Sequence, residues 1–141
     1  MLVRSGALQG YAQLVMELGE NPVKLLHQVG LSPAQFRDPN TYISYPAAAA
    51  LLELSAKICE QPCFGLLLAS RQNSSVLGDI GLAIPQKATL REALNSINQY
   101  LFLHANGVQI KQQQDSESLQ LKFNFRFDNN SGMEQLTQLS V

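Results

Sequence analysis

Apolar residues in the first two thirds of the chain recur at intervals of three and four, the spacing of helices that bury one face. Capping and breaking residues interrupt this pattern often, so the predicted helices are short. Asn21 precedes Pro22 and Ser32 precedes Pro33, which places an N-cap before a proline at the first helical position. The pattern stops at Gly19, Gly30, Asp38-Pro39 and Gln61-Pro62. The chain is therefore expected to begin with a bundle of short helices over about residues 5–106.

Each of these predicted helices has one apolar face. In the first, after Ser5, the face contains Leu8, Tyr11, Ala12, Val15 and Leu18. In the second it contains Val23, Leu26 and Val29. In the helix that Pro46 opens, a wider stripe contains Ala47, Leu51, Leu52, Leu54, Ser55 and Ile58. Residues 63–71, CFGLLLASR, predict a further short helix, and residues 72–75 a polar loop.

The stretch 77–101 predicts the main helix of this part. Thr89 stands three residues before Glu92, the spacing of a capping box in which each side chain satisfies a backbone N–H group. The apolar face that follows consists of Leu90, Leu94, Ile97 and Leu101. Before it, Gly78 and Gly81 lie in a short apolar segment, where the absence of a side chain permits close packing. These glycines and the capping pair are expected to serve packing rather than chemistry.

The periodicity changes after Gly107. Leu119, Leu121, Phe123, Phe125 and Phe127 alternate with polar residues, which is typical of a strand with one buried face. Val108 and Ile110 begin a partner strand, and residues 115–118 supply the reversal, so a β-hairpin is expected at about 108–127. Ser131 and Glu134 repeat the capping-box spacing, and a further helix is expected to start within 132–141.

These elements predict an α+β fold that is mainly α. A lone two-stranded hairpin is marginal in water, so this one is expected to start a larger α/β part. We therefore interpret residues 1–141 as a single, partial domain that is cut short or is completed by a partner.

Composition and charge indicate which partners and which cellular environment the chain is expected to have. Ten basic and eleven acidic residues give a net charge of −1, so no overall field attracts nucleic acid or anionic lipid. Two cysteines in a chain of 141 residues do not suggest a disulfide framework. The start is too short and too polar for a signal peptide, and no apolar run is long enough to span a membrane. A cytoplasmic protein without membrane contact is expected.

Residues 25–37, LLHQVGLSPAQFR, imitate a DNA-reading helix-turn-helix. The second helix would be little more than one turn long because Asp38-Pro39 follows, and few basic residues are near to contact phosphates. A structural helix corner is the favoured interpretation.

Cys59 and Cys63 are four residues apart, but Pro62 argues against one continuous helix that would bring both sulfurs to one face. A metal site would need His27 or His104 as further ligands. Packing in the core is the favoured role for the cysteines, and neither a metal nor another cofactor is expected.

Three side chains are weak candidates for binding a small ligand. His104 extends the apolar series of the main helix by one turn, and Tyr100 is adjacent to that stripe. Arg71 could contact an anion. Each also has a structural alternative, as a core or cap residue or as a cation near a helix C-terminus. No nucleophile elbow, phosphate loop or paired carboxylates are present, so the chain is not expected to be an enzyme.

Six short motifs follow one another in a specific order. They are Gly30-Leu31-Ser32, Asp38-Pro39, Ile43 with Pro46, Phe64-Gly65-Leu66, Leu77-Gly78-Asp79-Ile80-Gly81 and Thr89-Leu90-Arg91-Glu92-Ala93-Leu94. In this order the chain resembles the N-terminal effector-binding (arabinose-binding-type) domain of AraC-family transcriptional regulators. The resemblance extends from about Ser5 to Phe127.

The resemblance implies a bacterial transcription factor in which this domain binds a small effector. DNA would be bound only through a C-terminal domain of two helix-turn-helix units, which is absent from this chain. The family supplies no fixed ligand residues, and its effectors are diverse, so a sugar is not specifically implied. The domain is also expected to form a homodimer. The alternative is a non-catalytic interaction or dimerisation module without a small-molecule ligand, which uses an exposed strand edge or the face at Ala47–Ala50.

Overall fold

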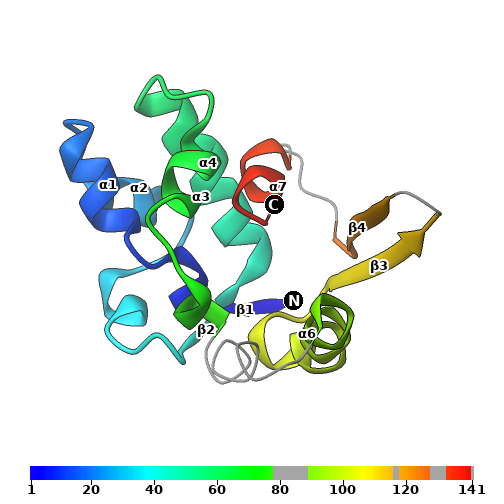
Figure 1. The fold of residues 1–141 in the computed structure, drawn as a ribbon. Coiled ribbons are helices and arrows are strands. Elements are labelled where there is room, and N and C mark those ends of the chain that lie inside the picture. Colours follow the sequence, from blue (N-terminus) through cyan, green and yellow to red (C-terminus); the bar gives the residue numbers. More distant parts are fainter. Residues whose placement is uncertain (78–88, 116–117, 128–132, 141) are drawn as a thin grey trace.

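The structure is a computed structural model that describes residues 1–141 except 78–88, 116–117, 128–132 and 141 (Figure 1). Its elements, in chain order, are β1 (Leu2–Arg4), η1 (Ser5–Leu8), α1 (Tyr11–Glu17), α2 (Pro22–Gln28), η2 (Pro33–Phe36), β2 (Tyr42–Ser44), α3 (Tyr45–Ile58), α4 (Phe64–Ala69), η3 (Ser74–Leu77), α6 (Leu90–His104), β3 (Val108–Gln114), β4 (Leu119–Phe125) and α7 (Glu134–Ser140). The η elements are short 3₁₀ helices. The predicted α+β class, mainly α, is confirmed.

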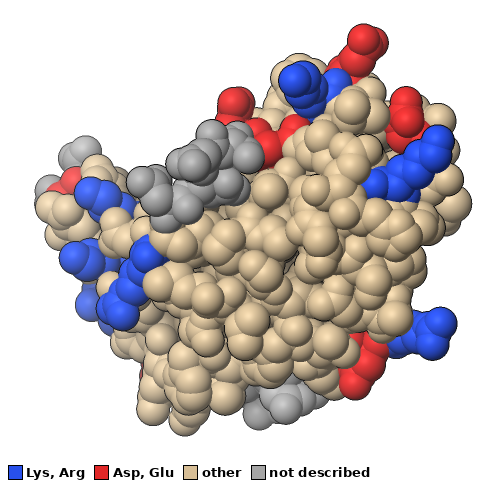
Figure 2. Space-filling model, turned by 180° about the vertical axis from the view of Figure 1, so that it is seen from behind, with Lys and Arg blue, Asp and Glu red and all other residues tan. Residues whose placement is uncertain are grey.

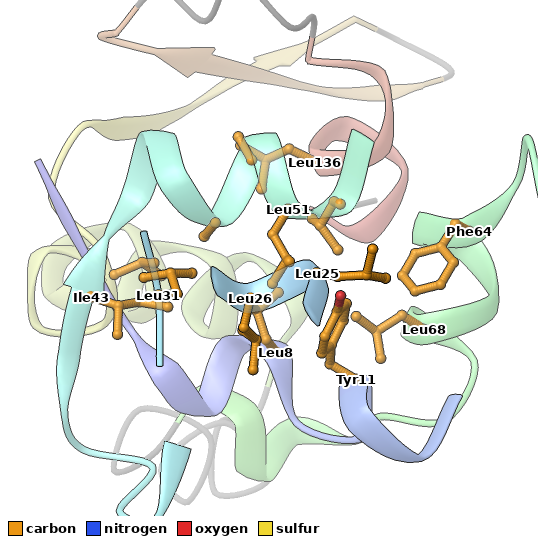
Figure 3. Packing of buried hydrophobic residues seen from close by; sticks show 14 of the residues in the cluster. Leu8, Tyr11, Leu25, Leu26, Leu31, Ile43, Leu51, Phe64, Leu68 and Leu136 are labelled. Atoms are coloured by element: carbon orange, nitrogen blue, oxygen red, sulfur yellow. The ribbon is translucent and has the colours of Figure 1, made fainter. Parts of the chain in front are cut away.

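Helix α3 lies at the centre of the hydrophobic core and contacts α2, α4 and α7 (Figure 3). Leu51 and Leu52 on α3 are fully buried, as is Phe64 at the start of α4. The Phe64 ring meets the Tyr11 ring of α1 edge-on, with 6.0 Å between the ring centroids. Helices α1 to α4 therefore share one core, to which α7 adds Leu136.

Helices α4 and α7 approach each other closely because residue 65 is a glycine. A Cβ atom at this position would lie 2.9 Å from the Cβ of Gln138, a separation that real Cβ atoms essentially never show. The buried Gln135 side chain accepts a hydrogen bond from the Gly65 amide and donates one to the Pro62 carbonyl, both at 2.8 Å. The last helix is thereby fastened to the middle of the chain.

The N-terminal strand joins two parts of the molecule. Strand β1 pairs antiparallel with β2, and Val3 forms an isolated bridge with Ala105, just after α6. In Figure 1, α1 to α4 and α7 gather on one side of β1, and α6 and the hairpin lie on the other. Strands β1 and β2 were not predicted from the sequence, because three-residue strands are too short to show alternation.

The predicted hairpin is formed by β3 and β4, which pair from Val108 with Phe125 to Gln114 with Leu119. Its apolar face is covered most fully near the base, although α6 also contacts β3 further along, where Gln112 donates to Asn95 at 3.4 Å and Arg91 donates to Gln114. At the base, Phe125 and Phe127 pack on Tyr45, with ring centroids 6.1 and 5.0 Å from the Tyr45 centroid. Leu119 and Leu121 near the tip are exposed, so the prediction that this face is buried throughout is wrong for them.

Several predicted helix faces also need correction. The first predicted helix is two elements, η1 and α1, because Gly10 between them has a left-handed φ of 86°. Val23 on α2 and Ile58 on α3 are exposed, and the buried positions beside them include Leu25 and Ala56. Cys59 packs against the core as predicted, but Cys63 is exposed and does not.

Helix α6 begins at the predicted cap. The Thr89 hydroxyl accepts a hydrogen bond from the Glu92 amide at 3.1 Å. Its predicted apolar face is only partly buried, however: Leu101 is buried, whereas Leu90 is 69% exposed. The expectations for Gly78, Gly81 and Ser131 concern positions outside the described residues.

Candidate functional site

A cleft of about 430 Å³ opens between η1, α1, α2 and η2. Its lining is mostly apolar. The apolar lining residues are Leu8, Tyr11, Ala12, Pro22, Val23, Leu26, Pro33, Phe36 and Pro39. Ser5, Gly6, Gln9 and Gly10 complete it. A volume of this size lies within the range of about 300–1,000 Å³ that is usual for small-molecule sites.

Local sequence features set the walls of the cleft. The left-handed conformations at Gly10 and Gly30, with φ of 86° and 76°, turn the chain before α1 and after α2. The start of α2 is fixed by Asn21, whose Oδ1 accepts hydrogen bonds from the Val23 and Lys24 amides at 3.0 and 3.3 Å. The walls are therefore formed by backbone geometry that does not depend on a ligand.

Two cleft residues of η1, Ser5 and Gly6, form hydrogen bonds with the segment that follows η2. The Gly6 amide donates to the Pro39 carbonyl at 3.0 Å, and a Cβ atom on Gly6 would lie only 3.1 Å from Pro39. The Ser5 hydroxyl donates to the Asp38 carbonyl at 2.9 Å. These contacts hold η1 against the segment that follows η2.

The hydroxyl group of Tyr11, one of the cleft residues, already forms a hydrogen bond within the protein. The Ser55 hydroxyl donates to the Leu51 carbonyl at 2.7 Å, which uses its one proton. Tyr11 lies 2.8 Å from the Ser55 oxygen, so the tyrosine hydroxyl is the donor in that pair. Burial raises the pKa of Tyr11 to about 12. Tyr11 therefore backs the cleft wall as a core residue, and its hydroxyl proton is committed to Ser55.

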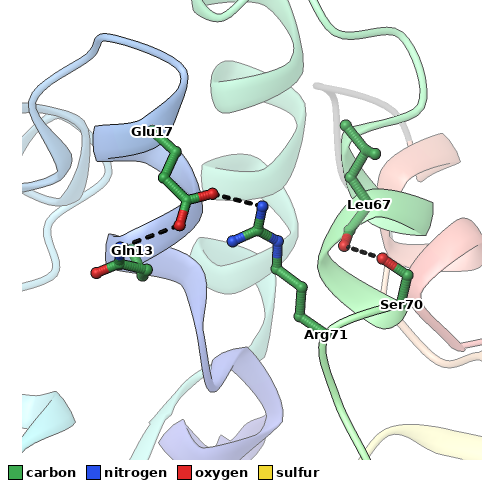
Figure 4. Close-up of polar contacts among 5 residues, drawn as sticks. All are labelled: Gln13, Glu17, Leu67, Ser70 and Arg71. Carbon is green, nitrogen blue, oxygen red and sulfur yellow. Dashed lines mark hydrogen bonds and ion pairs between the residues drawn. The ribbon is translucent and has the colours of Figure 1, made fainter.

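The predicted ligand candidates lie elsewhere. Arg71 forms an ion pair with Glu17 at 2.5 Å, and Gln13 donates to the same carboxylate at 3.0 Å (Figure 4). The hydrogen bond from Arg71 holds the pKa of Glu17 below its usual range. This pair links the segment after α4 to the end of α1, a structural role that occupies the Arg71 charge.

Tyr100 and His104 lie one turn apart on α6, and neither lines the cleft. Tyr100 is exposed. His104 is the last residue of α6, and its Nδ1 atom is buried without a hydrogen-bond partner among the described residues. Burial, with a smaller contribution from the nearby Arg4 charge, lowers the pKa of His104 to about 4. The imidazole is therefore neutral at pH 7.

The buried, neutral His104 predicts a loss of stability in acid. In the unfolded chain the imidazole takes up a proton near pH 6.5, but in the folded chain only near pH 4, so protonation favours unfolding between these values. We expect the free energy of unfolding to fall as the pH drops through this window, by about 3 kcal/mol, because one pKa unit corresponds to about 1.4 kcal/mol. Urea unfolding of the wild type and of His104→Gln at both ends of the window measures it.

The exposed histidine on α2 supplies the control for this experiment. The variant His27→Gln should retain the full pH dependence, whereas His104→Gln should lose the His104 part of it. Equal pH dependence in wild type and His104→Gln would show that His104 is not buried in its neutral form.

Comparison with known proteins identifies the family. Residues 19–139 match the family described as the arabinose-binding domain of AraC transcription regulators, N-terminal. The chain belongs to this family. The HTH-type transcriptional regulator VirS from two strains of Mycobacterium tuberculosis, CDC 1551 / Oshkosh and ATCC 25618 / H37Rv, is 33% identical over 104 residues. The match covers 74% of this chain and 31% of VirS, so the chain spans about a third of the length of these relatives.

The structure explains some of the motifs that carry the AraC-family resemblance. Gly30 ends α2 with a left-handed φ, and Ser32 opens η2, where its amide donates to the Gln35 side chain at 2.9 Å. Phe64 fills the core, and Gly65 permits the close approach of α7. The segment that imitates a DNA-reading motif contains only a four-residue 3₁₀ helix after its turn, and it forms one wall of the cleft.

Two further features are absent from the described residues of this AraC-family domain. Among the described residues, no group of three or more histidine, cysteine or acidic side chains is arranged to hold a metal ion. No helix in the described ranges is long and apolar enough to cross a membrane.

The cleft itself was not predicted from the sequence. Its walls come from four short elements, and its three prolines were interpreted only as caps and breakers. One sequence feature could have indicated the cleft. Pro22, Pro33 and Pro39 occur with Phe36 in a short segment that has few charges.

Proposed function

We propose that this chain is the effector-sensing portion of an AraC-type transcription regulator, and that a small organic effector binds in the cleft between η1, α1, α2 and η2. The observation that carries the proposal is a mostly apolar cleft of about 430 Å³ whose walls are held by backbone turns and hydrogen bonds. Such a site needs little rearrangement to accept a ligand. The role is non-catalytic.

The position of η1 suggests how binding would be transmitted. Ser5 at the start of η1 follows directly after β1, and β1 contacts the end of α6 through the bridge between Val3 and Ala105. The Asn106 amide also donates to the Leu2 carbonyl at 2.8 Å. An effector that favours one position of η1 would shift the population of states at this junction. In the full protein this shift would control a separate C-terminal DNA-binding domain.

DNA contact by this portion is not part of the proposal. On the face shown in Figure 2, lysine and arginine side chains project from the margins, and the middle is uncharged. Strong phosphate binding needs several basic groups together. The proposed role of the chain is to sense, with DNA recognition left to the other domain.

Dimerisation is a second candidate function, supported by the exposed apolar side chains of α6. Phe102 is 63% exposed, and Leu90 and Leu103 are exposed as well. The alternative face at Ala47–Ala50 does not suit a partner, because Ala48 and Ala49 are buried in the core. Light scattering of the wild type and of Phe102→Glu tests this candidate: a dimer that dissociates in the variant supports it, and a wild-type monomer contradicts it.

Effector binding is tested by blocking the cleft. Val23, on its wall, is 42% exposed, so Val23→Trp should fill the space without disturbing the core. A ligand present at about a hundredfold excess over its Kd stabilises the folded state by about 2.7 kcal/mol, which raises Tm by several degrees. Thermal unfolding is measured with a panel of neutral aromatic compounds, fatty alcohols, sugars, amino acids and carboxylates.

The control variant is Leu66→Trp, which adds the same indole to an exposed site on α4. We expect at least one compound class to stabilise the wild type and Leu66→Trp but not Val23→Trp. If no class shows this dependence on the cleft, the proposal is wrong.

A further inference from the structure

We infer that the cleft takes an uncharged, largely apolar organic molecule rather than a sugar or an anion. This inference rests on the proposed function, because it names the ligand class of the same site. It is based on three properties of the cleft: the chemistry of its side chains, the state of its helix N-terminus and the hydrogen bonds already made by its hydroxyl groups.

The first property is the absence of charge. None of the described residues that line the cleft is acidic, basic or a histidine. A charged ligand would lose hydration on entry without gaining an ion pair, which is unfavourable. The lining instead offers the accessible rings of Pro33, Phe36 and Pro39, which suit contact with carbon-rich surfaces.

The second property concerns α2, whose first residues Pro22 and Val23 line the cleft. Helix N-termini bind anions through free backbone N–H groups. Here Pro22 has no N–H, and the amides of Val23 and Lys24 already donate to the Asn21 side chain. The start of α2 therefore has no free first-turn amide to offer to a carboxylate or phosphate.

The third property concerns sugars, whose hydroxyl groups need several partners in a binding site. The Ser5 hydroxyl donates to the Asp38 carbonyl, and the Tyr11 hydroxyl donates to Ser55. Among the described residues of the lining, only Gln9 adds a further polar side chain. Hydroxyl groups left unpaired on entry each cost about 1–3 kcal/mol. The cleft of this chain therefore does not suit arabinose, despite the description of its family.

The test compares two fluorescent probes that differ only in charge. N-phenylnaphthylamine is neutral, and anilinonaphthalene sulfonate has the same ring system with an added sulfonate. We expect the neutral probe to bind the 141-residue chain at least about tenfold more tightly than the sulfonate, a difference of about 1.4 kcal/mol. L-arabinose, measured by calorimetry, should show no binding.

Matched variants locate the bound probe. Val23→Glu places a carboxylate on the cleft wall, in the first turn of α2, where the helix dipole favours an acidic residue and the fold should be retained. It should weaken binding of the neutral probe about tenfold. Leu90→Glu makes the equivalent change in the first turn of α6, outside the cleft, and should leave this binding unchanged.

The possible results separate this inference from the proposed function. Binding of arabinose or of the sulfonate that Val23→Glu weakens, in preference to the neutral probe, would overturn the ligand class and leave the cleft as the effector site. Binding of the neutral probe that only Leu90→Glu weakens would place the probe on α6 and overturn the inference. If Val23→Glu changes the binding of no probe, and Val23→Trp also leaves stabilisation by every compound class unchanged, both proposals are wrong.

Discussion

Replacing Phe64 by alanine is expected to lower the free energy of unfolding by about 3–5 kcal/mol. The Phe64 ring is 0% exposed and meets the Tyr11 ring edge-on, so its removal leaves a cavity at the junction of α1, α3 and α4. Tyr11 also forms part of the cleft wall, and the cavity should loosen the cleft as well as the core. Urea unfolding of the 141-residue chain, followed by far-ultraviolet circular dichroism, measures the change.

The same substitution at Phe102 is the control. Phe102 is 63% exposed on α6, so Phe102→Ala removes an equal side chain with little loss of buried surface. In the monomeric chain, where no partner covers α6, its effect should stay within about 0.5 kcal/mol. Equal effects of the two substitutions would contradict the assignment of Phe64 to the core.

Replacing Gly65 by alanine should separate α4 from α7 and lower the free energy of unfolding by about 2–4 kcal/mol. The new Cβ atom would clash with the α7 backbone at Gln135 and with the Gln138 side chain. Moving α7 away would also break the buried hydrogen bonds of Gln135. These losses outweigh the gain of about 1 kcal/mol in helix propensity that alanine brings.

A substitution at the adjacent, exposed Leu66 shows whether the effect of Gly65→Ala comes from lost packing or from a change in helix propensity. Leu66→Ala changes the same helix on its solvent side, and its effect should be small. If Gly65→Ala proves neutral or stabilising, the close contact between α4 and α7 does not exist in solution.

The sequence predicted the elements whose signals are local. Asn21 before Pro22 correctly located the start of α2, Thr89 located the start of α6, and the alternation from Leu119 to Phe125 predicted β4. Each of these signals depends on residues within a few positions of one another.

The contacts that join distant segments could not be predicted in this way. The three-residue strands β1 and β2 have too few residues for a period to be visible. The sequence predicted a helix near the C-terminus, but not that it would pack on Gly65. Helical spacing placed Leu90 on a buried face, although most of its side chain is exposed, because spacing alone does not say what covers a face.

The cleft could not be predicted from the sequence for the same reason. Its walls combine residues from four elements between positions 5 and 39, and no single segment has the composition of a binding motif. The sequence did suggest three candidates, Arg71, Tyr100 and His104, because a polar side chain can be identified as a possible ligand contact from its own type and position. An apolar cleft becomes visible only when the packing of its walls is known.

Binding of the effector in the cleft between η1, α1, α2 and η2 can be tested by locating a bound probe by NMR. Heteronuclear spectra of the isotopically labelled chain are recorded during titration with N-phenylnaphthylamine. We predict that the amide signals of Leu8, Tyr11 and Leu26 move with a common binding constant, and that those of α6 do not. Shifts confined to α6 and the hairpin, with the cleft residues unchanged, would show that the cleft is not the binding site.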